Sequence, residues 1–337
     1  MSTRPLPRTM TTSMPISKIA IVGAGTMGAN IALNFATHGR EVRLNDSDPA
    51  QLERALGIVR TNADLLRQHG LVIESVDQLI ERIVSESRLE QAVQGVDLVI
   101  EAVPEKLQLK RHIFSQLDRL CPPETIFASN SSTFVPSAMA LSLLHDTRKM
   151  QFLVMHYWNP AHLMPLVEIV PHPRTRPSVV DAVKALLTGC GKVPVVVRKE
   201  IAGFIGNRLA FALQREAMDL VSQGVASPED IDLVARTSFG RRLPVTGIFG
   251  TADLGGLDVY LAICRTLFPE LCSGTAPPPL LGRMVEQGNL GVKSGAGWSQ
   301  YTSEQIDALR EALTAELVHQ LQCDRKLMSA AGGAGPA

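Results

Sequence analysis

A histidine and a glutamate lie close together in this chain, each inside its own apolar run. His156 follows the apolar residues 152–155, and Glu168 lies within the run 166–170. An Asn-Pro pair at 159–160 separates the runs, so we expect two strands that fold back and bring the carboxylate to the imidazole. A carboxylate fixes the tautomer of a histidine and stabilises its charged form, which makes a tuned general base. A core histidine beside an unrelated surface glutamate is the alternative interpretation.

A glycine-rich stretch near the N-terminus has the spacing of a dinucleotide-binding turn. The apolar run 18–22 leads into Gly23, Gly25 and Gly28 of a G-x-G-x-x-G pattern, which also includes Thr26 and Met27, and a helical pattern follows. Gly23 permits the tight turn, Gly25 lets the backbone approach a pyrophosphate, and Gly28 lets the helix pack on the strand. The helix N-terminus then faces the anion. The glycines alone would also fit a generic tight turn, but the strand and helix around them favour a dinucleotide site.

A carboxylate follows the next apolar run at the distance expected for ribose binding. Asp46 ends the run 41–45 and lies 18 positions after Gly28. A carboxylate there accepts hydrogen bonds from the adenosine 2′-hydroxyl and repels a 2′-phosphate. We therefore predict that the cofactor is NAD, not NADP.

The elements that must position these residues read as a mostly parallel, doubly wound α/β sheet of the Rossmann type. Further buried strands are expected at 97–103, 125–128 and 193–197, with helices between them and a mostly helical segment from 71 to 92. No strand pattern follows residue 197, so we predict a second, all-helical domain. The expected divisions are a disordered extension (1–16), an NAD-binding domain (17–199), a helical substrate and dimerisation domain (200–325) and a disordered tail (326–337).

Composition excludes several classes of protein. Lys and Arg total 33, as do Asp and Glu, and aromatic residues make up 4% of the chain, which argues against nucleic acid and anionic membranes as partners. No apolar run approaches the roughly 18 residues of a membrane span. The five cysteines are scattered and form no CxxC pair. We therefore expect a cytoplasmic protein without a zinc site.

Several separate patterns in one order make the chain resemble the L-3-hydroxyacyl-CoA dehydrogenase family. They are the glycine loop, Ser-Asn-Ser-Ser at 129–132, His-Tyr-Trp-Asn-Pro at 156–160, Leu-Val-Glu at 166–168, Gly-Phe-Ile-Gly-Asn-Arg at 203–208 and a closing G-x-K-x-G-x-G at 291–297. The resemblance covers roughly residues 17 to 302.

The resemblance implies a role for each matching residue. His156 is then the general base and Glu168 orients it, while Ser132 binds the substrate oxygen and Asn207 contacts the substrate near the reacting carbon. Glu105 and Lys110 match positions on the cofactor side. The plainer interpretations are a turn former for Ser132, a first-turn helix acid for Glu105 and a solvated lysine for Lys110. The resemblance also implies NAD as cofactor, a small-molecule substrate and a homodimer.

Two departures from the family pattern concern the substrate. His-Tyr-Trp-Asn-Pro replaces the usual H-F-F-N-P, and the helix after Asp48, which is usually lysine-rich and approaches the CoA, offers only Arg54, Arg60 and Arg67. The chain also resembles the branch of the family that acts on free hydroxy acids. This branch includes gulonate 3-dehydrogenase with lambda-crystallin, carnitine dehydrogenase, and a pyridine-carboxylate alcohol dehydrogenase of vitamin B6 breakdown. In that branch His162 or His172 could receive a substrate carboxylate, or both could be ordinary loop histidines.

The leading function is NAD-dependent oxidation of a short-chain 3-hydroxyacyl-CoA to the 3-keto product, in fatty acid metabolism. The alternative is the same chemistry on a free 3-hydroxy acid such as gulonate or carnitine. A rival of another class is a non-catalytic, crystallin-like structural protein that binds NAD.

Overall fold

A computed structural model describes residues 16–330, with side chains through residue 326. The predicted extension and tail therefore lie mostly outside the described residues. Ile16, which we placed in the extension, is buried against the first core. That placement was wrong for this residue, because the apolar side chain contributes to the core just before the first strand.

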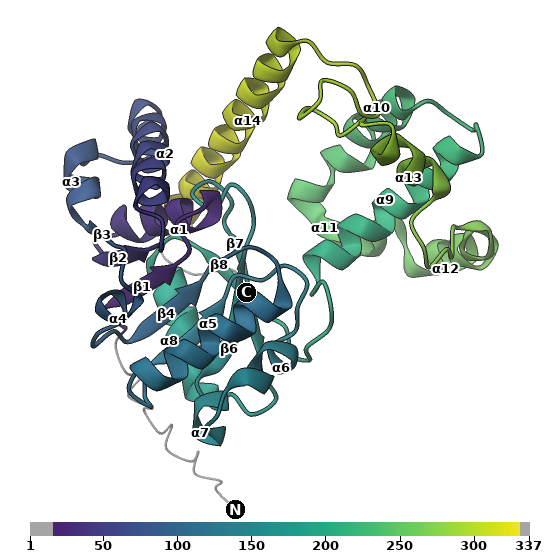
Figure 1. Cartoon of the computed structure of the whole chain (residues 1–337). Coiled ribbons are helices and arrows are strands. Elements are labelled where there is room, and N and C mark those ends of the chain that lie inside the picture. Colours follow the sequence, from purple (N-terminus) through teal and green to yellow (C-terminus); the bar gives the residue numbers. More distant parts are fainter. Residues whose placement is uncertain (1–15, 331–337) are drawn as a thin grey trace, which may run out of the picture. The chain divides into compact units, whose positions relative to one another are not determined.

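Eight strands form one sheet in the order β3-β2-β1-β4-β5-β6-β7-β8 (Figure 1). All neighbouring pairs are parallel except β6 and β7, which are antiparallel. The strands are β1 (Ile19–Val22), β2 (Val42–Asn45), β3 (Ile83–Glu86), β4 (Leu98–Glu101), β5 (Ile126–Ser129), β6 (Phe152–Tyr157), β7 (Leu166–Pro171) and β8 (Val193–Val196). The predicted doubly wound sheet is confirmed.

Helices cover both faces of this sheet. On β1, Ile19 and Ile21 belong to one apolar core and Ala20 and Val22 to the other, as alternation along a strand requires. The first core includes α1 (Thr26–Ala36), α2 (Pro49–Gln68), α3 (Val76–Glu81) and α8 (Pro177–Gly189). The second includes α4 (Leu89–Ala92), α5 (Leu107–Leu120), α6 (Pro136–Met139) and the 3₁₀ turn Ala140–Ser142. The short helix α7 (Asp146–Lys149) precedes β6.

Local capping explains where α2 begins. Asp48 accepts a hydrogen bond from the backbone N–H of Ala50, and Pro49 occupies the first helical position, where no N–H is needed.

The segment 71–92 differs from the prediction, because it contains the strand β3. This strand lies at the sheet edge, where Ile83 is buried but Val84 and Ser85 are exposed. An edge strand buries few side chains, so it carries little of the apolar pattern by which strands are predicted.

The structure contains a second compact unit, Gly206–Thr314, which is helical. Its helices are α9 (Gly206–Ser222), α10 (Pro228–Thr237), α11 (Leu243–Gly255), α12 (Leu257–Leu267) and α13 (Pro279–Glu286), with 3₁₀ turns at Phe239–Arg241 and Phe268–Glu270. None of its residues, all of which the structure describes, is buried within the chain. The second unit therefore lacks an apolar core of its own.

The last helix, α14 (Ser303–Ala330), leaves the second unit at Thr314 and continues in the first. Val318 is only 2% exposed and belongs to the first core, and Arg325 donates to the carbonyl of Leu71. Residues 315–325 therefore differ from the predicted domain division, and residues 326–330 are helical where we predicted disorder. The helical pattern predicts this helix, but a local pattern does not reveal which core the helix covers.

Within residues 16–330, no single helix has the length and hydropathy needed to cross a membrane. Leu243–Gly255 and Leu257–Glu270 meet those criteria only as a pair, and they are bent by 97° relative to each other.

Candidate active site

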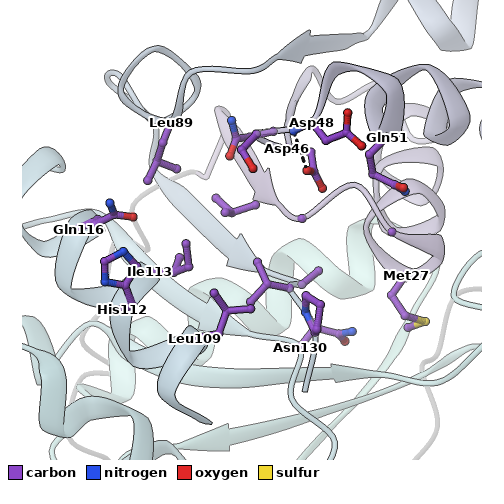
Figure 2. A pocket seen from close by; sticks show the side chains of 18 of the residues that line it. Met27, Asp46, Asp48, Gln51, Leu89, Leu109, His112, Ile113, Gln116 and Asn130 are labelled. Carbon is purple, nitrogen blue, oxygen red and sulfur yellow. Dashed lines mark hydrogen bonds between the residues drawn. The ribbon is translucent and has the colours of Figure 1, made fainter. Parts of the chain in front are cut away.

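A cleft of about 1090 Å³ opens at the carboxyl ends of β1, β2 and β4. The strand order reverses between β1 and β4, and this is where open α/β sheets bind ligands. Figure 2 shows the acidic side chains of Asp46 and Asp48 on one side of the cleft, and α5 across from them. The predicted cofactor residues that line it are Gly23, Gly25, Thr26, Met27, Asp46 and Glu105.

The three glycines of the loop each meet a different constraint. Gly23 has φ +107°, and a Cβ there would lie 2.7 Å from the backbone of Ala102. A Cβ on Gly28 would lie 1.9 Å from the carbonyl oxygen of Gly23, so the helix packs directly on the turn. A Cβ on Gly25 would meet nothing within 4 Å. Gly25 precedes α1 and lines the cleft, so its missing side chain leaves room for a phosphate at the helix N-terminus.

Asp46 is held rigidly at the edge of the cleft. One carboxylate oxygen accepts from the backbone N–H of Ala24 at 3.0 Å, and the other accepts from that of Asp48 at 3.1 Å. The open space at Gly25, the free helix terminus and this carboxylate fit an adenine dinucleotide.

Glu105 joins the cleft to the turn that carries Ser132. Its Oε1 accepts from the Ser131 hydroxyl at 2.6 Å, from the Ser132 and Thr133 backbone N–H groups at 3.1 Å each, and from the Thr133 hydroxyl at 2.9 Å. Burial alone would raise the pKa of Glu105, but the hydrogen bonds and the charge of Lys110 outweigh it and lower the pKa. Glu105 is therefore an ionised anchor for the turn, and Ser132 lines the cleft beside it.

Lys110 lies beneath the cleft and is neither solvated nor part of its lining. Its ammonium is 1% exposed and contacts Glu101 Oε1 at 2.8 Å and Glu105 Oε2 at 3.2 Å. Burial raises the pKa of Glu101, although Lys110 and the Ser129 hydroxyl act in the opposite direction. The solvated-lysine interpretation is therefore wrong, because Lys110 is buried and forms an ion pair with Glu105.

The predicted histidine–glutamate contact is present. His156 and Glu168 face each other across the antiparallel strands β6 and β7, and His156 Nδ1 lies 2.8 Å from Glu168 Oε2. Both side chains are almost completely buried. The alternative of an unrelated surface glutamate is therefore excluded.

Two backbone or side-chain donors contact Glu168, and an aromatic ring lies against His156. The Trp158 indole N–H donates to Glu168 Oε2 at 3.4 Å, and the Ile205 backbone N–H donates to Oε1 at 2.9 Å. Ile205 is delivered by a turn in which Phe204 has φ +52°, a conformation that costs energy in a bulky residue. The Phe204 ring centroid lies 5.3 Å from that of His156. The strained turn therefore places the Phe204 ring against the imidazole and the Ile205 backbone N–H against the carboxylate.

His162 and His172 do not line the cleft, and Asn207 belongs to the second unit. Asn207 is in the first turn of α9, in the second unit, so its contact with substrate stays a prediction. His162 is buried, and burial together with the Lys192 charge lowers its pKa to about 4. Lys192 is itself buried and donates to the carbonyls of Ala161 and Met164, in the loop that joins β6 to β7. His162 is thus a core residue in this structure, while His172, half-buried, follows β7.

The chain matches two family models along most of its length. Residues 18–201 match the NAD-binding domain of 3-hydroxyacyl-CoA dehydrogenase, and residues 203–301 match the C-terminal domain of the same enzyme. The chain belongs to the 3-hydroxyacyl-CoA dehydrogenase family. It is an NAD-dependent oxidoreductase, as the resemblance implied.

Three relatives that match most of this chain are named as different proteins. A solved 5-formyl-3-hydroxy-2-methylpyridine 4-carboxylic acid 5-dehydrogenase, an NAD⁺-dependent dismutase, is 32% identical with a TM-score of 0.84, covering 93% of this chain and 99% of that one. The lambda-crystallin homolog of Homo sapiens is 39% identical over 73% of this chain and 76% of its own. A probable 3-hydroxybutyryl-CoA dehydrogenase of Bacillus subtilis is 37% identical over 86% and 98%, respectively.

Some residues of the site were not predicted from the sequence. Glu101 could have been found, because a carboxylate inside the apolar run 97–103 requires a buried partner. Asn130 accepts from the Tyr157 backbone N–H, and thereby links the Ser132 turn to the strand of His156. No local sequence pattern indicates the roles of Trp158 and of the 201–205 turn, because both roles depend on tertiary contacts.

Proposed function

We propose that this enzyme oxidises the secondary hydroxyl of a 3-hydroxy acid to the keto product, with His156 as the general base. The observation that carries the proposal is the buried 2.8 Å contact between His156 Nδ1 and Glu168 Oε2. Glu168 also accepts hydrogen bonds from Trp158 and Ile205. In its contact with His156 the carboxylate is again the acceptor, so the proton is on His156 Nδ1. Nε2 is then the ring atom that takes the proton of the alcohol.

The remaining steps follow from this assignment. NAD, when bound, supplies the acceptor for the hydride that leaves the alcohol carbon. The hydroxyl proton moves to His156 Nε2, and Glu168 stabilises the imidazolium that forms. Ser132, fixed through Glu105, holds the substrate oxygen where its charge changes. Asn207 is assigned the second contact near the reacting carbon.

Two observations favour a free hydroxy acid over a CoA thioester. On α2, Arg54 pairs with Asp48 at 3.1 Å and Arg60 pairs with Asp77 at 3.1 Å, so two of the three cations expected to meet a CoA phosphate already have carboxylate partners. The solved relative with a TM-score of 0.84 is named for a carboxylic acid substrate. The free acid therefore moves ahead of the thioester that the sequence favoured.

A short-chain 3-hydroxyacyl-CoA is the second candidate. The relative that is named a probable 3-hydroxybutyryl-CoA dehydrogenase is aligned over 98% of its length at 37% identity. A role in fatty acid metabolism depends on this candidate.

A substrate panel separates the candidates. The appearance of NADH is followed with gulonate, carnitine and (S)-3-hydroxybutyryl-CoA, for the unaltered protein and for His156→Ala. We expect turnover with a free acid, its loss in His156→Ala, and unchanged NAD binding in that variant. Turnover only with the thioester overturns the free-acid proposal. Unchanged turnover in His156→Ala removes His156 as the base, and no turnover with any substrate favours the crystallin-like alternative.

We also infer a homodimer. The second unit buries no residue, and Val245, Phe249 and Leu254 are 86%, 83% and 79% exposed. A second copy would cover such apolar side chains. Sedimentation analysis should find a dimer that Phe249→Asp dissociates, while Ile73→Asp, an exposed site on the first unit, leaves it intact. Cytoplasmic location stays a prediction that rests on cysteine usage.

A further inference from the structure

Strand register places Trp158 on the same face of the sheet as His156. His156 pairs with Glu168 and Tyr157 pairs with Val167 across β6 and β7. Side chains alternate along a strand, so His156 and Trp158 lie on one face and Tyr157 lies on the other. Tyr157 accordingly belongs to the first apolar core, while the Trp158 ring centroid lies 5.8 Å from that of His156.

Trp158 and His156 share one acceptor atom. Glu168 Oε2 lies 2.8 Å from His156 Nδ1 and 3.4 Å from the Trp158 indole nitrogen. A second donor on the same oxygen withdraws part of its negative charge from the first. The imidazolium of His156 is then less stabilised than it would be by Glu168 alone.

We propose that Trp158 is a positioning residue that sets the pH range of the base by sharing the carboxylate of Glu168. This inference rests on the proposed role of His156. By weakening the hold on the imidazolium, Trp158 keeps His156 in the neutral form at lower pH. The neutral form is the one that takes a proton from an alcohol, so this residue extends the oxidation to lower pH.

The Ile205 backbone N–H also donates to Glu168, but to Oε1 and not to the shared Oε2, and this contact involves no side chain that the variants below replace. The 201–205 turn contributes the uncharged ring of Phe204, and β7 contributes the carboxylate of Glu168. Neighbouring β5 ends in Ser129, whose hydroxyl donates to Glu101, and Glu101 is itself paired with Lys110. That charged pair is the same in every variant below.

The test is a direct titration of His156. The protein carries ¹³C-labelled histidine and is saturated with NAD, and the His156 signal is assigned by its absence in His156→Gln. In Trp158→Phe, which keeps a ring but removes the N–H, we expect the midpoint of protonation to move up by about half a pH unit. Tyr157→Phe is the matched control, because its hydroxyl has no hydrogen-bond partner within the part of the chain that the structure describes. Its midpoint should stay unchanged.

A second measurement retains the indole and thus the fold. Trp158 and Trp298 are the two tryptophans of the chain, so growth on 5-fluorotryptophan in a Trp298→Phe background labels Trp158 alone. Fluorine makes the indole N–H a stronger donor, so the midpoint should move down. Shifts of opposite sign in the two experiments support the proposal. A midpoint that stays fixed in either experiment, or moves equally in Tyr157→Phe, overturns it.

Kinetics separate this inference from the proposed function. With the substrate that the panel identifies, the pH of half-maximal oxidation should move upward in Trp158→Phe together with the titration midpoint. A moving midpoint in a protein that turns over no substrate would contradict the proposed function and leave the sharing of Glu168 intact.

Discussion

A side chain on Gly28 would collide with Gly23, since a Cβ there would lie 1.9 Å from the Gly23 carbonyl oxygen. A side chain on Gly25, two residues after Gly23, would meet nothing within 4 Å. Gly28 is therefore needed for the packing of the helix on the turn, whereas Gly25 leaves space for the ligand.

Alanine at these two positions should separate the two roles. Gly28→Ala overpacks the contact between α1 and the turn, and it should cost about 1–3 kcal/mol of unfolding free energy. Gly25→Ala should unfold at the unaltered temperature but bind NAD at least about tenfold more weakly, because the methyl group occupies the approach of the pyrophosphate. Thermal unfolding and NAD titration by calorimetry measure both effects. Equal losses of stability in the two variants would contradict this division.

Asp46 should control the choice between NAD and NADP. Replacing it with alanine removes the acceptor for the ribose hydroxyl and the repulsion of a 2′-phosphate. The KM for NADP should fall relative to the KM for NAD. Asp48→Asn is the control, because Asp48 also lines the cleft but caps α2. If the ratio moves equally in both variants, Asp46 is not the ribose acid.

Glu168→Gln should slow turnover without loosening the cofactor. The amide keeps the size of the side chain but removes the charge that stabilises the imidazolium, so kcat should fall about 10²-fold. The affinity for NAD, measured by fluorescence titration, should stay the same, because Glu168 does not line the cofactor cleft. Full activity in Glu168→Gln would show that His156 works without its carboxylate.

His162 should make the fold sensitive to acid. Burial and the Lys192 charge lower its pKa from 6.5 to about 4, so the unfolded chain binds a proton between these values while the folded chain does not. His162 therefore leaves the unfolding free energy unchanged above pH 6.5 and lowers it as the pH falls, by about 3 kcal/mol at pH 4. Urea unfolding across this range should show a smaller loss in His162→Gln than in the unaltered protein. The exposed His145→Gln is the control and should follow the unaltered protein.

The sequence predicts the parts of this site that depend on local patterns. Two apolar runs and a turn were enough to pair His156 with Glu168, because antiparallel neighbours fix which residues face each other. The glycine loop and Asp46 were predictable for the same reason, since their spacing follows from one strand, one turn and one helix. Interactions between distant segments were not predictable: nothing local indicates that the Ile205 backbone N–H reaches Glu168, or that Lys110 is buried between two carboxylates.

The return of α14 to the first unit has a consequence for biosynthesis. Val318 belongs to the core beneath the NAD-binding sheet, yet the ribosome makes it only after Gly206–Thr314 has been synthesised. The nascent NAD-binding unit therefore leaves the exit tunnel with part of its apolar surface still uncovered. The core is therefore completed by a segment that is made after the whole helical unit, and chaperone binding to the newly made chain should persist until residues 315–326 are free to fold.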